Sequence, residues 1–132
     1  MIFRPELALA IVRHEKTQTR RALSDNPRSP WSSAGCRYQL HDVFAVQPGR
    51  GVPRVANARV IAPTRCEPIE SITATEARME GFADEAAFLE AFFAINPSAT
   101  PRDLVWVIEF SVTSTIAKRF RELEARVEGA TA

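Results

Sequence analysis

The segment from Lys16 to Arg21, with the sequence KTQTRR, gathers the side chains of this chain that are best suited to chemistry. The whole sequence holds fifteen arginines and two lysines, so a lysine inside this cluster is unusual for the chain. A lysine ammonium can lose its proton when it is desolvated, whereas an arginine guanidinium stays charged and holds phosphate through paired hydrogen bonds. The segment therefore offers a titratable amine beside hydroxyl groups and groups that bind anions.

The two halves of the sequence differ in charge, although the net charge is +1. Residues 1–66 carry eleven Lys and Arg against four acids, a balance of +7, and residues 67–132 carry six against twelve, a balance of −6. Such an asymmetry predicts a basic face that attracts phosphates, while ordinary solvated surface charge explains the same numbers. Arg50, in a glycine-flanked turn, is a further candidate for ligand binding, and a purely structural turn is the alternative.

A helix and a strand are predicted to position the cluster. Apolar residues at helical spacing predict a helix from about Pro5 to Glu15, with the proline in its first turn. Thr17 and Thr19 alternate with polar neighbours, which predicts a strand from Lys16 to Arg21 with one row of side chains facing a cleft.

The remaining patterns predict one α+β domain over residues 1–132, with its core at about 5–113. Alternating apolar residues predict strands over residues 42–46, 54–62 and 104–113. Thr73 and Glu76 form a capping-box pattern for a short helix that stops at Gly81. Asp84 caps a second helix, and an amphipathic helix is predicted from residue 115 to about 127. The second helix has a core-facing apolar stripe made of Phe88, Leu89, Phe92 and Phe93.

The segment from Ser24 to Gly35 is predicted to be a long surface loop, because it is rich in serine and proline and has almost nothing to pack except Trp31. An indole in such a loop is a candidate surface for stacking an unpaired base. Trp106, by contrast, lies in an apolar strand and is predicted to belong to the core.

Several classes of protein are disfavoured. The apolar run at residues 7–12 has the flanks of neither a signal peptide nor a membrane span, so we expect a cytoplasmic protein with no membrane partner. Cys36 and Cys66 are expected to be reduced thiols. His14 and His41 have no other ligands at metal-binding spacing, so neither a metal nor a cofactor is expected. The sequence carries no signal for a particular oligomeric state.

These features resemble the ASCH domain, a β-barrel relative of the PUA-like RNA-binding modules. The resemblance rests on the Lys16–Arg21 cluster behind an N-terminal helix, and on the later turn that contains Glu80, Gly81 and Phe82. Strands around residues 42–46 and 105–110 add to it. A glycine is common in the family two residues before the lysine, where this chain has His14.

The resemblance implies a barrel of five or six strands flanked by helices, to which this chain adds a C-terminal helix. It also implies a cleft lined by the lysine-threonine strand, which binds RNA or a modified nucleoside. Arg20 or Arg21 would hold a phosphate there, with Lys16 as a point charge and Gln18 beside them. An open basic groove would favour RNA, and a closed pocket around Thr19 would favour a nucleoside.

One branch of the family hydrolyses the amide of acetylcytidine with a lysine, a threonine three residues later and a glutamate from the second half of the domain. Lys16, Thr19 and Glu80 stand at those positions, so the resemblance implies a threonine nucleophile, a lysine base and a glutamate that assists proton transfer. Two alternatives stay open. The same cleft would suit a ribonuclease, or Lys16 and Glu80 would form an ion pair that is purely structural.

Overall fold

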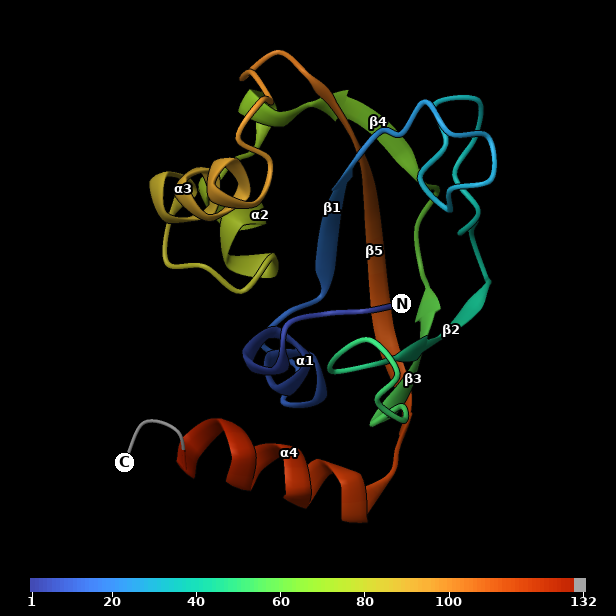
Figure 1. The fold of residues 1–132 in the computed structure, drawn as a ribbon, viewed down its shortest axis with the longest axis vertical. Helices are drawn as coiled ribbons and strands as arrows, with labels where there is room; N and C mark the ends of the chain where they lie inside the picture. The colour runs from blue at the N-terminus through green and yellow to red at the C-terminus, as the bar shows by residue number, and fades with distance from the viewer. Residues whose placement is uncertain (130–132) are drawn as a thin grey trace.

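The sheet is organised around one long strand, β5 (Leu104–Thr115), in a computed structural model that describes residues 1–129 (Figure 1). Along one edge of β5 runs β1 (Gln18–Ala22), antiparallel to it. Along the other edge run β3 (Ala56–Val60) and then β4 (Arg65–Pro68), also antiparallel. Beyond β3 lies β2 (Val43–Val46), so the order is β1-β5-β3-β2 with β4 beside β5.

The α+β architecture of five strands, flanking helices and a C-terminal helix confirms the predicted fold class, but the prediction of a barrel is wrong in one respect. The sheet is not closed, because within residues 1–129 the outer strands β1 and β2 do not pair with each other. Closure requires that pairing. The N-terminal segment occupies the end of β2 instead, where Phe3 N–H donates to Gln47 O and Gln47 N–H donates to Met1 O.

The helix α1 (Pro5–Val12) begins at its proline, as predicted, but ends three residues before the predicted Glu15. The chain turns at His14, whose φ of 61° lies in the left-handed region that favours glycine. This is the position at which a glycine is common in ASCH domains. The turn brings the following residue pair, Glu15 and Lys16, back against the helix, where both backbone N–H groups donate to Ala10 O.

Both predicted helix starts in the second half are confirmed. Thr73 and Glu76 form a complete capping box on α2 (Ala74–Met79), and the Asp84 side chain accepts from Ala87 N–H at the start of α3 (Glu85–Ile95). Gly81 follows α2 with a φ of 94°, a conformation that needs glycine. A short 3₁₀ turn (Ile69–Ser71) precedes α2.

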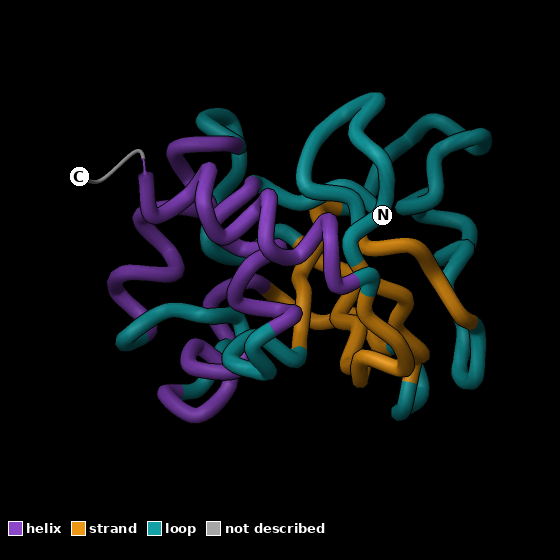
Figure 2. The backbone as a smooth tube through the Cα atoms, turned by 90° about the horizontal axis from the view of Figure 1, so that it is seen from below, coloured by secondary structure: helices purple, strands orange, loops and turns teal. Residues whose placement is uncertain are grey.

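The helices lie on one side of the strands, as Figure 2 shows from below. The C-terminal helix α4 (Ala117–Gly129) packs across α1, where Arg13 forms ion pairs with Glu124 and Glu128. Two apolar clusters share β5. Ile108 and Phe110 join the cluster under α1 and α4, whereas Val105 and Val107 join the cluster that contains the α3 stripe residues Phe88 and Phe92.

The strand predictions differ from the structure mainly at the ends. The strand predicted from Lys16 is β1, which begins at Gln18, and the strand predicted over 104–113 runs on to Thr115. The strand β4 was not predicted, because its short RCEP sequence has no β-branched or aromatic residue and no alternation of apolar side chains. Cys36 and Cys66 are both free thiols, as expected. No helix within residues 1–129 is long and apolar enough to cross a membrane.

Candidate functional site

The side chains of β1 point alternately to its two faces, which have different environments. Gln18 and Arg20 belong to one face, where Arg20 Nε donates to Gln18 Oε1 at 3.3 Å. Thr19 and Arg21 belong to the other, where Arg21 Nε donates to Thr19 Oγ1 at 3.2 Å. The alternation expected for a strand therefore splits the predicted KTQTRR cluster between two sites.

Lys16 lies just before β1, and its ammonium group is buried. Its Nζ donates to Gln18 O at 2.7 Å, to Glu80 O at 2.9 Å and to Glu80 Oε1 at 3.3 Å. Three acceptors match the three donors of an ammonium group. Burial lowers the pKa of Lys16, against the opposing effect of the Glu80 carboxylate.

Glu80 meets Lys16 because two turns hold their backbones together. Glu80 follows α2, and the backbone N–H of Thr17 donates to Met79 O at 2.8 Å. Burial raises the pKa of Glu80, against the effects of the Lys16 ammonium and of Arg20, whose charge and backbone N–H favour the carboxylate, and the Glu80 side chain is 3% exposed. Its second oxygen, Oε2, has no hydrogen-bond partner among the residues that the structure describes. A buried acceptor of this kind is left for a ligand or a water molecule to satisfy.

The Arg21 side chain contacts Thr19, the N-terminal segment and the Ser24–Gly35 loop. Its guanidinium lies 5.0 Å from the ring centre of Phe3 and 5.2 Å from that of Trp31, within the range of cation–π contacts. Its Nη2 donates to Ile2 O at 2.8 Å. Burial lowers the pKa of Arg21. Because Arg21 donates to Thr19 Oγ1, the hydroxyl proton of Thr19 stays free to be given to another group.

A cavity of about 330 Å³ brings Lys16, Thr19, Arg21 and Glu80 together, and we call it the aromatic cavity. Its size is in the range of pockets for small ligands. Its remaining walls are mostly apolar: Phe3, Leu7, Ala22, Trp31, Phe82, Phe88, Ala91, Phe92 and Ile95, with Arg4, Arg20 and Asn96 completing the lining.

Most of the apolar walls of the cavity were not predicted as parts of a site. Phe88 and Phe92 were predicted as core, and they are buried, but they also line the cavity. Phe82 was named only as part of the turn that carries the family resemblance, and Phe3 was not singled out. A helical stripe predicts burial, and nothing in its period distinguishes a side chain packed on a strand from one packed beside a ligand pocket.

The loop that carries Trp31 is anchored rather than free. The indole Nε1 of Trp106, which is half-buried, donates to Trp31 O and Ser32 O at 3.2 and 3.1 Å. The Trp31 ring packs against Tyr38, with ring centres 5.3 Å apart. The predicted stacking residue therefore lies at the cavity, and Arg21 lies against its ring.

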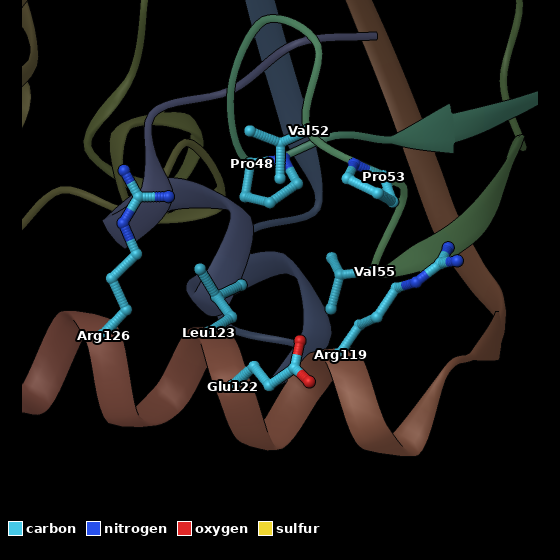
Figure 3. A pocket seen from close by; sticks show the side chains of 8 residues that line it. All are labelled: Pro48, Val52, Pro53, Val55, Arg119, Glu122, Leu123 and Arg126. Carbon is cyan, nitrogen blue, oxygen red and sulfur yellow. The ribbon is translucent and has the colours of Figure 1, made fainter.

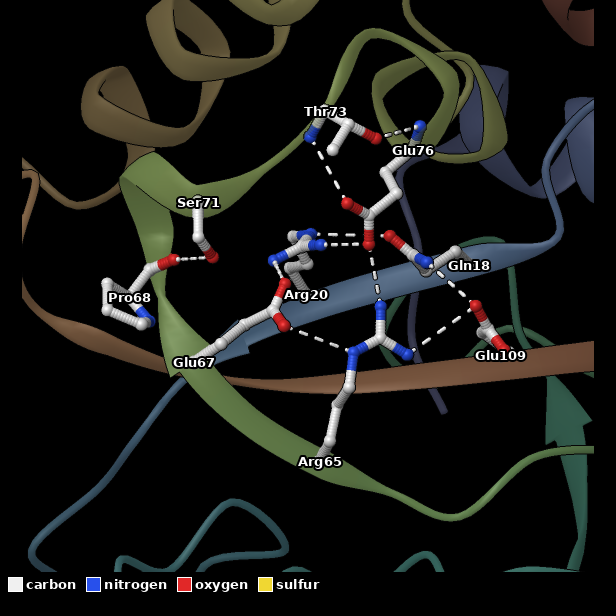
Figure 4. A network of polar contacts seen from close by, with 9 residues as sticks. All are labelled: Gln18, Arg20, Arg65, Glu67, Pro68, Ser71, Thr73, Glu76 and Glu109. Carbon is white, nitrogen blue, oxygen red and sulfur yellow. Dashed lines mark hydrogen bonds and ion pairs between the residues drawn. The ribbon is translucent and has the colours of Figure 1, made fainter.

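The opposite face of β1 holds a charge network made of Gln18, Arg20, Arg65, Glu67, Glu76 and Glu109 (Figure 4). The buried Arg20 guanidinium lies 2.7 Å from Glu67 Oε1 and 2.8 Å from Glu76 Oε2. Burial opposes the ionisation of Glu67, but hydrogen bonds from Arg20 and Arg65 lower its pKa below the ordinary value. Arg20 and Gln18 are thus already engaged by protein groups.

Arg50 lies apart from the other predicted residues, in the exposed turn between β2 and β3. This turn borders a second cavity of about 200 Å³ beside α4, whose lining does not include Arg50 (Figure 3). Side chains that line it include Val55, Leu123, Arg119 and Arg126. Within residues 1–129, no three His, Cys, Asp or Glu side chains are arranged to hold a metal ion.

No protein-family model matches this chain, and no curated protein matches it. Solved structures do resemble it. An ASCH domain from Lactobacillus crispatus superposes with a TM-score of 0.66 at 18% identity, over 83% of this chain and 71% of the other. A DUF984 protein from Enterococcus faecalis gives 0.64 at 16%, over 86% and 71%. An ASCH protein from Zymomonas mobilis gives 0.50 at 19%, over 92% and 75%. At such low identity these likenesses concern the fold alone.

Proposed function

Because the chain has the ASCH fold, we propose that it binds a nucleoside in the aromatic cavity. The observation that carries this proposal is the cavity itself, which encloses Thr19 among aromatic walls and has room for a small ligand. Trp31, Phe82 and Phe88 line this cavity, and stacking of a base on an aromatic ring contributes about 1–3 kcal/mol per base.

The distribution of charge favours a nucleoside over RNA. Of the predicted phosphate-binding groups, Arg20 is held by two carboxylates and Lys16 is paired with Glu80. The guanidinium of Arg21 is stacked between two rings. A polyanion needs several free cations along a groove, and each contact makes binding weaker as salt rises. For the same reason a ribonuclease is a poorer fit to this cavity.

Calorimetric titration of the purified protein with cytidine, with acetylcytidine and with a short single-stranded RNA tests the proposal. We expect the nucleosides to bind with an affinity that changes little between low and high salt, and the RNA to bind weakly or not at all. The Phe92→Trp variant, which narrows the cavity, should lose the nucleoside. RNA binding that is tighter than nucleoside binding, with a steep salt dependence, would overturn the proposal.

A second candidate function is the metal-independent hydrolysis of an acylated cytidine, favoured by the presence of Lys16, Thr19 and Glu80 in one cavity. Burial lowers the pKa of Lys16 and raises that of Glu80, so both shifts favour a neutral amine beside a neutral carboxyl. A neutral Lys16 would take the Thr19 proton as Oγ1 bonds to the acyl carbon. The carbon–nitrogen bond then breaks, the proton passes to the leaving amine, and water hydrolyses the threonine ester.

Hydrolysis of acetylcytidine in the presence of a chelator tests this second candidate. Thr19→Ala and Lys16→Ala should each lower the rate by orders of magnitude, and the double variant should lose little more, because the residues act as a unit. Thr19→Ser, which keeps the hydroxyl, is the matched control and should retain activity. Activity that survives Thr19→Ala would eliminate the mechanism, and binding without turnover in the wild type would leave the binding function alone.

A further inference from the structure

We propose that the cleft has a second compartment, which takes the sugar of an uncharged nucleoside and disfavours its phosphorylated forms. This inference rests on the proposed nucleoside site and adds the class of nucleoside that it accepts. The compartment, which we call the outer chamber, has a volume of about 640 Å³.

The outer chamber adjoins the aromatic cavity. Both are lined by Ala22, Phe92, Ile95 and Asn96, so the end of α3 and the end of β1 form their common wall. A ligand bound against Thr19 would therefore extend past Phe92 into the chamber. Ile95, which is 55% exposed, lies at this junction and would be covered by such a ligand.

The two compartments differ in chemistry. The aromatic cavity is lined mostly by aromatic and aliphatic side chains. The outer chamber offers hydroxyl, amide and carboxylate groups, which are the partners that sugar hydroxyls need: Asp25, Ser33, Asn96, Ser98 and Asp103. We therefore expect the nucleoside to bind with its base against the aromatic rings and its sugar in the outer chamber, because each part then lies beside groups of matching chemistry.

The charges of the outer chamber act against phosphate. Its lining, among the residues that the structure describes, contains two carboxylates and no Lys, Arg or His. Asp103 accepts hydrogen bonds from Thr100 N–H and Oγ1, which lower its pKa and keep it ionised. The cationic residues of the cleft, Arg4, Lys16, Arg20 and Arg21, line the aromatic cavity instead. A phosphate on the sugar would thus meet two like charges.

Titration of the wild type with cytidine, cytidine 5′-monophosphate and free cytosine tests this arrangement at low and high salt. We expect cytidine to bind about tenfold tighter than the monophosphate at low salt, and the gap to narrow as salt screens the carboxylates. Cytosine should bind more weakly than cytidine, because it leaves the chamber empty. A monophosphate that binds as tightly as cytidine would overturn the inference.

The double variant Asp25→Asn/Asp103→Asn locates the discrimination. Both asparagines keep an acceptor oxygen, so the fold should persist, and the readout is the ratio of the two affinities: the gap between cytidine and its monophosphate should fall to about threefold or less. Glu90→Gln, which removes an exposed carboxylate of α3 outside the chamber lining, is the matched control and should keep the full gap. An unchanged gap in the double variant would refute the role of the chamber. Failure of every nucleoside to bind the wild type would instead refute the proposed function.

Discussion

On one face of β1, Arg20 lies between Glu67 and Glu76, whereas behind the other face Lys16 lies against Glu80 alone. Both cations are buried, but the carboxylates that pair with them differ in how far they are exposed to solvent. The side chains of Glu67 and Glu76 are 23% and 18% exposed, and Arg65 joins them at the surface. The side chain of Glu80 is 3% exposed and keeps one oxygen unpartnered.

The difference separates a structural arrangement from a functional one. In the charge network, each carboxylate contacts an arginine and is partly exposed to water. The negative and the positive charges are therefore both well stabilised. In the Lys16–Glu80 pair, burial disfavours both charged forms, and the buried Oε2 of Glu80 has no hydrogen-bond partner among the described residues. Groups held in this costly state tend to mark functional sites.

The largest effect is expected from breaking the buried pair. Lys16→Ala leaves the Glu80 carboxyl buried without its partner, and we expect a loss of about 3–5 kcal/mol in the free energy of unfolding, measured in urea. The double variant Lys16→Met/Glu80→Leu removes both charges and should recover much of that loss. A single-variant loss below about 1 kcal/mol would mean that the pair is not desolvated as the structure shows.

Arg20→Ala should have the next largest effect on stability and no effect on the affinity for the nucleoside. It separates Glu67 and Glu76 from one of their two cations, and we expect a loss of about 2–3 kcal/mol, since the carboxylates keep Arg65 and some water. Cytidine affinity should stay within about threefold of the wild type. A large loss of affinity in the folded variant would place Arg20 with the ligand, as the sequence first suggested, and would break the comparison.

Arg21→Ala is the matched change on the cavity face. Arg21 is half-buried and bound by two rings, a carbonyl and Thr19, so the cost in stability should be about 1 kcal/mol. The loss of nucleoside affinity, or of hydrolysis if it occurs, should be about tenfold or more, because Thr19 and Trp31 lose their common anchor. Equal stability losses for Arg20→Ala and Arg21→Ala, with no change in affinity for either, would contradict a functional cavity face.

Acid should weaken the charge network and spare the buried pair. The folded pKa of Glu67 is lowered from 4.5, so its contribution is complete above that value and is lost as pH falls through the lower folded pKa. The free energy of unfolding should therefore fall less between about pH 6 and about pH 3.5 in Glu67→Gln than in the wild type. The pKa of Glu80 is shifted upward, so Glu80→Gln should not reduce that loss, and a reduction there would reverse our assignment.

The smallest effect is expected at the turn behind α1. His14 adopts a left-handed φ of 61°, which costs a residue with a side chain about 1 kcal/mol relative to glycine. His14→Gly should therefore raise stability by about 0.5–1 kcal/mol, without a change in nucleoside affinity. A stabilised variant that loses affinity would show that the turn positions Lys16 through more than its backbone.

Local patterns in the sequence were enough to predict the helices and the long strand, whereas the Lys16–Thr19–Glu80 grouping is what the resemblance to the ASCH domain implied. Local signals account for the helix starts, because Thr73 and Asp84 cap their own helices. Other features depend on partners distant in sequence. The pairing of Arg20 with Glu67 and Glu76 requires β4 and α2 to lie beside β1, and the open sheet depends on how the N-terminal segment meets Gln47. Neither residue spacing nor composition contains those contacts.

The position of β5 also has a consequence for the order in which the molecule forms. Gln18 pairs with Glu109, 91 residues later, and β3 and β4 must pair with the same strand from its other edge. Contacts of such long sequence separation slow folding, because loop closure must precede them. During synthesis, β1 would leave the ribosome long before its partner, and neither face of it would be complete until β5 had emerged. Until then the charged side chains of β1 would stay in water.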